Sequence, residues 1–243
     1  MSTGPGILFL ISRPVEAYRQ AAERAGLGDC RFEAPLNFQF QSMPAHLLAS
    51  SKGIVLSSQT GAESLAGYPV GGKPCWAIGS ATAKAAELQG LRVQAVVEGG
   101  GARFIEALDR QDFQLPDAGL IWPTAQQPAF DLDRALAQRG VDLTRISAYA
   151  ATAKPSPSTQ TAAWLGEHPT AIVALFSQQC MHAFSMWQST PGLDWKPAKM
   201  LAIGPRVFDG VTDFPEVERY WPAVASRQSF TEMLASMSDG GEG

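Results

Sequence analysis

Two stretches of the sequence each lead from a short apolar run through a glycine into residues that could bind an anion. The first, Cys75 to Ala86, reads CWAIGSATAKAA, and the second, Met200 to Val211, reads MLAIGPRVFDGV. A glycine at the end of a strand lets a ligand approach the backbone closely. A helix that starts at such a corner has free N–H groups, which bind carboxylates without a net positive charge. We therefore interpret both stretches as strand-to-helix corners that could hold an anionic ligand.

Each half of the chain has two such corners. In all of them a hydroxyl, amide or basic side chain could contact a ligand, although capping of the helix is the simpler role for the serines and the threonine. The candidate residues are Ser58, Gln59, Gly79, Ser80, Thr82, Ser177, Gln178, Gly204 and Arg206. The histidines and cysteines have no spacing that is typical of a metal site, and no nucleotide-binding motif is present, so neither a metal nor a cofactor is expected.

The composition is that of a globular protein. Of 243 residues, 45% are hydrophobic and 17% are charged, and the formal net charge is −4. Nucleic acids and anionic membranes attract basic surfaces, so neither is an expected partner. No apolar run approaches the roughly 18–20 residues of a membrane span, and GILFLI near the start is too short for a signal-peptide core. A cytoplasmic protein with free, buried thiols is predicted.

The elements that would position the corners alternate between apolar runs and helical stretches. This alternation is typical of βα units and of a mostly parallel sheet. The expected pairs of strand and helix are ILFLI with 15–25, GIVLS with 61–65, CWAIG with 81–89, GLIWP with 130–139, AIVALFS with 179–187, MLAIG with 206–211 and YWPAVAS with 230–237.

The two halves of the chain resemble each other. Ser58-Gln59 recurs as Ser177-Gln178, and Ala77-Ile78-Gly79 recurs as Ala202-Ile203-Gly204. A long repeat that occurs about twice predicts two similar lobes rather than a solenoid. The counterpart of the first strand lies in the middle of the chain, so the middle would form one lobe and the two ends would form the other.

We therefore predict an α/β protein with two similar lobes, each a parallel sheet flanked by helices, joined by a two-stranded β ladder. Residues 1–36 and 154–243 would build the first lobe, and residues 37–153 would build the second. The chain would cross between them near PLNFQFQ, which alternates like an extended strand, and near KPSPS, which is proline-rich and extended.

The order of several motifs resembles that of the uroporphyrinogen-III synthase family over nearly the whole chain. The motifs are ISRP, VLSSQTGAESL, CWAIGSATAKAAELQGLRV, ISAYAAT, FSQQCMHAF and LAIGP. The resemblance implies a bilobed, cofactor-free enzyme of tetrapyrrole biosynthesis. Such an enzyme closes the linear tetrapyrrole hydroxymethylbilane into uroporphyrinogen III, with loss of water and inversion of the last pyrrole ring. A transient contact with the preceding enzyme of the pathway is a further expected partnership.

The resemblance also assigns roles to individual residues. Tyr149 matches the family's functionally important tyrosine, and its phenol could protonate the leaving hydroxyl if a hydrogen bond positioned it. The alternative is a tyrosine at a strand end that packs one face of its ring. Arg13 and Lys199 match basic residues of the family, with surface ion pairing or solvation as the alternative. The threonine and the two serines of the corners match family residues as well.

The second glycine corner departs from the family. Arg206 and the three residues after it stand where the family usually has hydroxyl and small residues, and DGVTDFP predicts that the following helix is short. Arg206 could replace the lost carboxylate contact by a charge-assisted one. The alternative function is therefore a non-catalytic two-lobed protein that binds a tetrapyrrole or another polycarboxylate.

Overall fold

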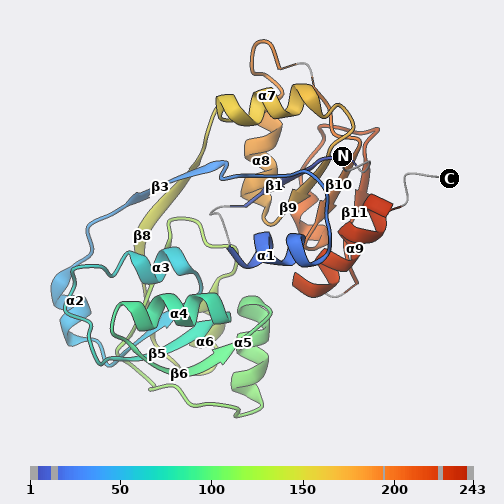
Figure 1. Ribbon diagram of the computed structural model, residues 1–243. Helices are drawn as coiled ribbons and strands as arrows, with labels where there is room; N and C mark the ends of the chain where they lie inside the picture. The colour runs from blue at the N-terminus through green and yellow to red at the C-terminus, as the bar shows by residue number, and fades with distance from the viewer. Residues whose placement is uncertain (1–4, 12–15, 194, 224–226, 240–243) are drawn as a thin grey trace. The chain divides into compact units, whose positions relative to one another are not determined.

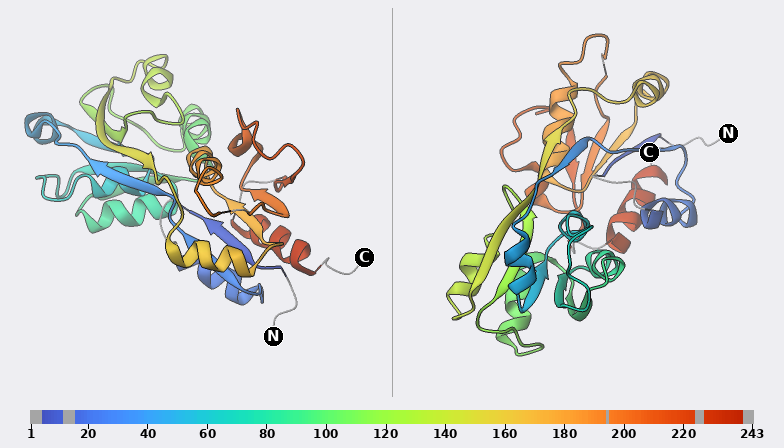
Figure 2. Two further views of the ribbon diagram at one scale, coloured as in Figure 1. Left: turned by 90° about the horizontal axis from the view of Figure 1, so that it is seen from above. Right: turned by 90° about the vertical axis from the view of Figure 1, so that its left-hand side faces the viewer.

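The computed structural model describes residues 5–11, 16–193, 195–223 and 227–239. The chain divides into two compact units, which we call unit 1 (Met1–Asn37 with Thr152–Gly243) and unit 2 (Phe38–Ala151). Each unit is built around one sheet with helices on its faces (Figures 1 and 2). No helix in these described ranges combines the length and the apolar character that crossing a membrane requires.

Unit 1 contains a five-stranded sheet in the order β11-β10-β9-β1-β2, and all its strand pairs run parallel. Its strands are β1 (Ile7–Leu10), β2 (Cys30–Glu33), β9 (Ile172–Leu175), β10 (Lys199–Ala202) and β11 (Glu218–Tyr220). Its helices are α1 (Glu16–Arg24), α7 (Thr159–Glu167), α8 (Gln178–Trp187), the short 3-10 helix η1 (Pro205–Phe208) and α9 (Arg227–Asp239).

The second sheet has six strands in the order β3-β8-β7-β4-β5-β6, and it is parallel from β8 to β6. Its strands are β3 (Leu36–Phe40), β4 (Gly53–Leu56), β5 (Pro74–Ile78), β6 (Arg92–Val97), β7 (Leu120–Ala125) and β8 (Leu143–Ala153). The helices of unit 2 are α2 (Ala45–Ser50), α3 (Gln59–Glu63), α4 (Ser80–Leu88), α5 (Gly100–Asp109) and α6 (Leu132–Ala137).

The two sheets place equivalent strands in the same order. Every strand of the unit 1 sheet has an equivalent in the second sheet. The order β11-β10-β9-β1-β2 in the first corresponds to the order β6-β5-β4-β7-β8 in the second. The sequence repeat follows this pairing, since Ser58 and Ser177 come after β4 and β9, and Gly79 and Gly204 come after β5 and β10. The predicted α/β fold with two similar parallel sheets is therefore confirmed, and β3 is the additional strand.

The chain passes between the units along β3 and β8, which are neighbours in the second sheet. The N–H of Gln41 donates to the carbonyl of Ala148, and the N–H of Lys154 donates to the carbonyl of Pro35, both at 2.9 Å. Residue numbers therefore rise along one segment as they fall along the other, which makes the pair antiparallel. This is the two-stranded ladder that the sequence predicts.

A polar cluster fixes the ends of both crossing segments to unit 1. Glu33, at the end of β2, is 8% exposed and accepts hydrogen bonds from the hydroxyls of Ser158 (2.6 Å) and Thr161 (2.5 Å) at the start of α7. Lys154 adds an ion pair with Glu33 at 4.0 Å. A buried carboxylate is stable only when such donors satisfy it, so this cluster defines where the ladder enters the unit.

Side chains of the strands alternate between two cores, because successive residues of a strand point to opposite faces. In unit 2, Ile54 packs with Ala86 of α4 on one face, whereas Val55 packs with Phe104 of α5 and Leu136 of α6 on the other. These two helical layers hold the ends of the strands in fixed positions.

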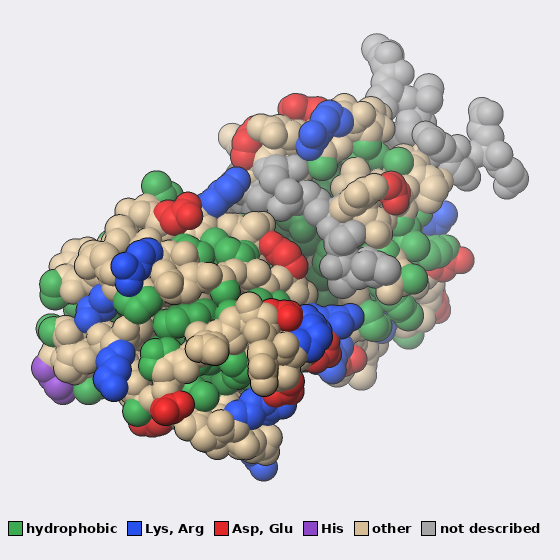
Figure 3. Space-filling view, turned by 90° about the horizontal axis from the view of Figure 1, so that it is seen from below, with side chains coloured by type: hydrophobic (Ala, Val, Ile, Leu, Met, Phe, Trp, Pro, Cys, Tyr) green, Lys and Arg blue, Asp and Glu red, His purple; other side chains and the backbone are tan. Residues whose placement is uncertain are grey.

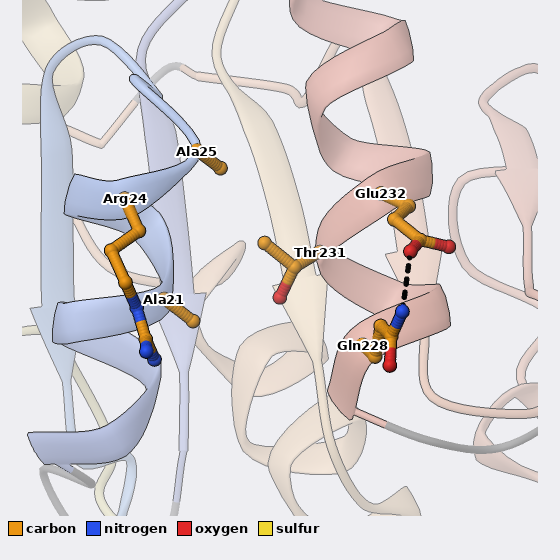
Figure 4. Close-up of a pocket in the computed structure, with 6 residues that line it drawn as sticks. All are labelled: Ala21, Arg24, Ala25, Gln228, Thr231 and Glu232. Carbon is orange, nitrogen blue, oxygen red and sulfur yellow. Dashed lines mark hydrogen bonds between the residues drawn. The ribbon is translucent and has the colours of Figure 1, made fainter.

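In unit 1, α1 and α9 lie side by side over one face of the sheet (Figures 1 and 2). Ala22 of α1 and Phe230 of α9 pack there with Phe9 and Ile172 of the central strands. A pocket of about 500 Å³ lies between the two helices and is lined by Ala21, Arg24, Ala25, Gln228, Thr231 and Glu232 (Figure 4).

Two expected elements differ from what the sequence patterns suggest. The helix expected over 206–211 is only η1, because Asp209 adopts an extended backbone (φ −61°, ψ 129°) and Gly210 after it has a φ of 74°. The strand expected in YWPAVAS is wrong in position: β11 covers Glu218–Tyr220 and shares only Tyr220 with that stretch, of which residues 224–226 lie outside the described residues. The proline at position 222 has no N–H to donate to a ladder, so pairing stops before it.

The three cysteines are free thiols. Cys75 and Cys180 are buried as expected, whereas Cys30 is only partly buried. Burial raises the pKa of the Cys75 thiol to about 12, and burial together with the charge of Asp29 raises the pKa of Cys30 to about 11. Both thiols are therefore protonated and unreactive at neutral pH.

Candidate functional site

The carboxyl edge of the unit 2 sheet gathers most of the predicted site residues. Because β4, β5, β6 and β7 run parallel, the residues that follow them lie along one edge. Ser58 and Gln59 follow β4, and Gly79, Ser80 and Thr82 follow β5. Tyr149 of β8 reaches the same level, since it pairs in register with Ala125, the last residue of β7.

Ser58 and Tyr149 form a direct side-chain pair within this edge. Their oxygens, Oγ and Oη, lie 2.9 Å apart, and either can be the donor. Ser58 Oγ also caps α3, because it accepts the N–H of Gly61 at 3.0 Å. Tyr149 is 7% exposed, with its ring edge-on to Phe38 at 6.0 Å between centroids. Ser58 therefore has the capping role that the sequence offered as the simpler alternative, and its hydroxyl also contacts Tyr149.

The hydrogen bond from the Gly61 N–H determines what the Ser58 hydroxyl can still offer to Tyr149. Ser58 uses a lone pair to accept that N–H, so its single proton remains available to donate to the phenol oxygen of Tyr149. In that arrangement the phenol proton is not used in the bond to Ser58. A phenol held in this way can transfer its proton to a leaving group.

Gly61 is a positioning residue that the sequence analysis missed. A Cβ atom on this glycine would lie 2.6 Å from the carbonyl oxygen of Pro123 and 3.2 Å from Ser58 Oγ. Only glycine therefore allows α3 to start so close to β7. The signal in the sequence is a glycine inside a helical stretch, which is uncommon without a packing reason.

The corner after β5 has the geometry of an anion site, but its first N–H is occupied. Gly79 has a φ of 91°, a left-handed value that favours glycine, and α4 begins directly after it. The N–H of Ser80 donates to Oε1 of Glu98 at 2.7 Å. Thr82 is buried, at 5% exposure. Glu98 follows β6 and is a second residue that sequence reasoning did not identify.

In unit 1 the carboxyl edge brings together Ser177, Gln178, Gly204 and Arg206. Ser177 caps α8, accepting the N–H of Cys180 at 3.1 Å. The side-chain amide of Gln178 donates to the carbonyl of Asp209 at 2.8 Å, so it holds the segment after η1 in place. Gln178 thus has a structural partner where the sequence predicted a ligand contact.

Arg206 is an exposed cation of this edge. It lies in η1, and in the described ranges of the chain no group forms a hydrogen bond or ion pair with its guanidinium. Gly204 before it has a φ of −172°, an extended conformation that any residue can adopt. The corner therefore offers a side-chain charge rather than a cradle of backbone N–H groups.

Of the two predicted basic residues, Lys199 does not join these groups. It is the first residue of β10, so it lies at the amino edge of the sheet, about 10 Å along the strand from Ala202, the last residue of β10. Its ammonium nitrogen lies 6.0 Å from the ring centroid of Tyr220. Arg13 lies outside the described residues. None of the predicted site residues lines the pocket between α1 and α9.

The surface charge shows no basic stripe on the face drawn in Figure 3, where Lys and Arg side chains lie among Asp and Glu side chains. Within the described ranges, no group of three or more His, Cys, Asp or Glu residues is arranged to hold a metal ion. The described residues at the two edges offer hydroxyls, backbone N–H groups and single charges.

Comparison with known proteins places this geometry in a family context. A family model described as "Uroporphyrinogen-III synthase HemD" matches residues 16–231. No curated protein matches the chain. The solved uroporphyrinogen-III synthetase from Helicobacter pylori is similar, with a TM-score of 0.65 and 13% identity, covering 96% of this chain and 99% of that one. A mutant uroporphyrinogen III synthase from Thermus thermophilus has a TM-score of 0.51 and 18% identity, covering 97% and 96%. At these identities the two structures show a shared fold.

Proposed function

The chain belongs to the uroporphyrinogen-III synthase family, which closes hydroxymethylbilane into uroporphyrinogen III, and we propose that Tyr149 and Ser58 form the catalytic pair for this reaction. The activity is that of a cyclising hydro-lyase. The family match favours this enzyme over a non-catalytic protein that only binds a polycarboxylate.

The reaction requires acid assistance to the departing hydroxyl group and close positioning of the linear tetrapyrrole. Protonation of the terminal hydroxyl lets it leave as water, and the electron-rich pyrrole is left as a reactive azafulvenium cation. This intermediate closes without help into the symmetric isomer I, so the protein must direct attack to the substituted carbon of the last ring through a spiro intermediate. Positioning and charge stabilisation therefore matter more than strong acids or bases.

The observation that carries the proposal is the 2.9 Å contact between Ser58 Oγ and Tyr149 Oη. Ser58 donates to the phenol oxygen, and Tyr149 passes its own proton to the leaving hydroxyl. The negative charge that then develops on the phenol oxygen is stabilised by the hydrogen bond from Ser58. Gly61 fixes the serine, because the cap bond sets its rotamer.

The substrate carboxylates need separate binding groups. The first turn of α4 offers backbone N–H groups and the Thr82 hydroxyl in unit 2. The edge of unit 1 offers Ser177 and the guanidinium of Arg206, which suits a carboxylate by charge and by its planar fork of donors. Lys199 and Arg13 remain proposed contacts that the described geometry does not place at these edges.

The cellular setting follows from the instability of the substrate. Hydroxymethylbilane that escapes closes into the unwanted isomer, so the proposed enzyme would act in the cytoplasm beside the enzyme that makes its substrate. A transient complex of the two would be detected as a higher isomer III fraction when both are mixed than when the substrate is pre-formed and added late.

The test of the function is isomer analysis of the purified protein given freshly generated hydroxymethylbilane. Predominant isomer III, separated from the isomer I that forms unaided, is the expected result. A protein that is folded by circular dichroism yet yields only isomer I would contradict the proposal.

A further inference from the structure

The first turn of α4 is occupied by a carboxylate of the protein itself. Glu98 follows β6, the neighbour of β5 in the sheet, and its Oε1 accepts the N–H of Ser80 at 2.7 Å. α4 has nine residues, so its N-terminus has the partial positive charge that attracts anions. In the free protein this charge is already compensated by Glu98.

A second observation concerns the Thr82 side chain at the same corner. Thr82 is 5% exposed, and within the described residues its hydroxyl has no hydrogen-bond partner. Its oxygen is not one of the fully buried atoms without a partner in the described ranges, so it is accessible to a ligand. A Cβ atom built on Gly79 would lie 3.8 Å from Thr82 Oγ1 and 3.9 Å from Glu98 Oε2. Both oxygens therefore border the same open stretch of backbone.

Glu98 is well placed to leave this position. Glu98 is exposed, and among the described residues it forms no ion pair. The two residues that follow it, Gly99 and Gly100, have φ values of 94° and 87°. Within the described ranges, no cation is paired with the carboxylate to hold it against a competitor.

We propose that Glu98 is a specificity-determining residue that competes with a substrate carboxylate for the first turn of α4. A ligand carboxylate that enters the corner must displace Glu98 from the Ser80 N–H and must do so against the repulsion of a like charge. Glu98 thereby weakens binding of the octacarboxylate product and assists its release. This inference rests on the proposed function.

The test is the affinity of three proteins for uroporphyrinogen III under anaerobic conditions: the unchanged chain, Glu98→Gln and Glu98→Ala. Glutamine keeps an acceptor for the Ser80 N–H but removes the charge, whereas alanine removes both. We expect Kd to fall in the order unchanged chain, Gln, Ala, with about a five-fold total gain for alanine. The gain should be smaller for coproporphyrinogen III, which carries fewer carboxylates.

Glu87→Gln is the matched control, because it removes the same charge from the opposite end of the same helix. Its Kd should equal that of the unchanged chain. Equal or weaker binding by both Glu98 variants, in protein shown to be folded, would overturn the proposal. Failure of the proposed function is seen separately, as absence of isomer III from the unchanged chain.

Discussion

The two serine corners are nearly identical, whereas the two glycine corners have diverged. Ser58 has φ and ψ of −156° and 153°, and Ser177 has −157° and 156°. Each accepts an N–H from three residues later, at 3.0 and 3.1 Å. By contrast, Gly79 has a φ of 91° before a nine-residue helix, and Gly204 has a φ of −172° before a four-residue 3-10 helix.

This difference indicates that both units need the serine cap, whereas only one has kept the left-handed glycine corner. Every strand-to-helix junction has free N–H groups to satisfy, so a serine cap supports the fold of either unit. A ligand-binding corner is under no such requirement. In unit 1 a proline at position 205 removes one N–H donor, and the exposed Arg206 supplies a charge in its place. We therefore propose that catalysis takes place in unit 2 and that unit 1 contributes a charge-based contact to a carboxylate.

The largest expected effect is that of Tyr149→Phe. Loss of the proton donor should lower kcat by at least about 100-fold with little change in KM, as is typical of general acid catalysis. Steady-state formation of isomer III measures it. Tyr220→Phe is the matched control, since this tyrosine lies on the last strand of unit 1 and bonds to the exposed Glu218. An unchanged rate in Tyr149→Phe would remove this residue from any acid role.

A smaller effect is expected for Arg206→Gln, which tests the charge in unit 1. KM should rise by about 10-fold while kcat is retained, because a charge-assisted hydrogen bond to the substrate is lost. The rise should shrink at high salt, which already weakens the attraction in the unchanged protein. Arg24→Gln serves as the control, since Arg24 lies on α1 in the same unit. Equal KM values for the two variants would show that Arg206 does not contact the substrate.

The smallest expected effect is a difference in stability between alanine variants of Gly79 and Gly204. Gly79→Ala forces a side chain into a left-handed conformation and should lower the free energy of unfolding by about 1–2 kcal/mol. Gly204→Ala should be nearly neutral, because its backbone is extended and no atom lies within 4 Å of the added Cβ. Urea unfolding of both variants measures the difference. Equal losses would mean that the two corners do not differ as described.

Local patterns were sufficient to predict the strands β1, β4, β5, β7, β9 and β10, the serine caps and the duplication. A serine after an apolar run is read from a few adjacent residues, and both Ser58 and Ser177 cap helices as such a pattern predicts. The edge position of Lys199 could also have been predicted. It stands at the start of its strand, and residues there lie at the amino edge of a parallel sheet, away from those that follow the strands.

The contacts that the sequence did not reveal are those between elements. Glu98 reaches Ser80 across the register of two strands, 18 residues away, and no local pattern indicates that distance. Gly61 is required by a carbonyl oxygen of Pro123 that belongs to another strand. Tyr149 was identified from the family resemblance, and its partner Ser58 lies 91 residues away.

The most direct test of the asymmetry between the units is a comparison of Ser58→Ala with Ser177→Ala. The two caps have the same geometry, so each variant should lose about 1 kcal/mol of stability and show a similar fall in Tm. Because the two variants should lose similar stability, any difference between their kcat values reports on catalysis. We expect Ser58→Ala to lower kcat for isomer III by at least about 10-fold, whereas Ser177→Ala should raise KM and keep kcat. Equal losses of kcat, or a larger loss in Ser177→Ala, would contradict the assignment of catalysis to unit 2.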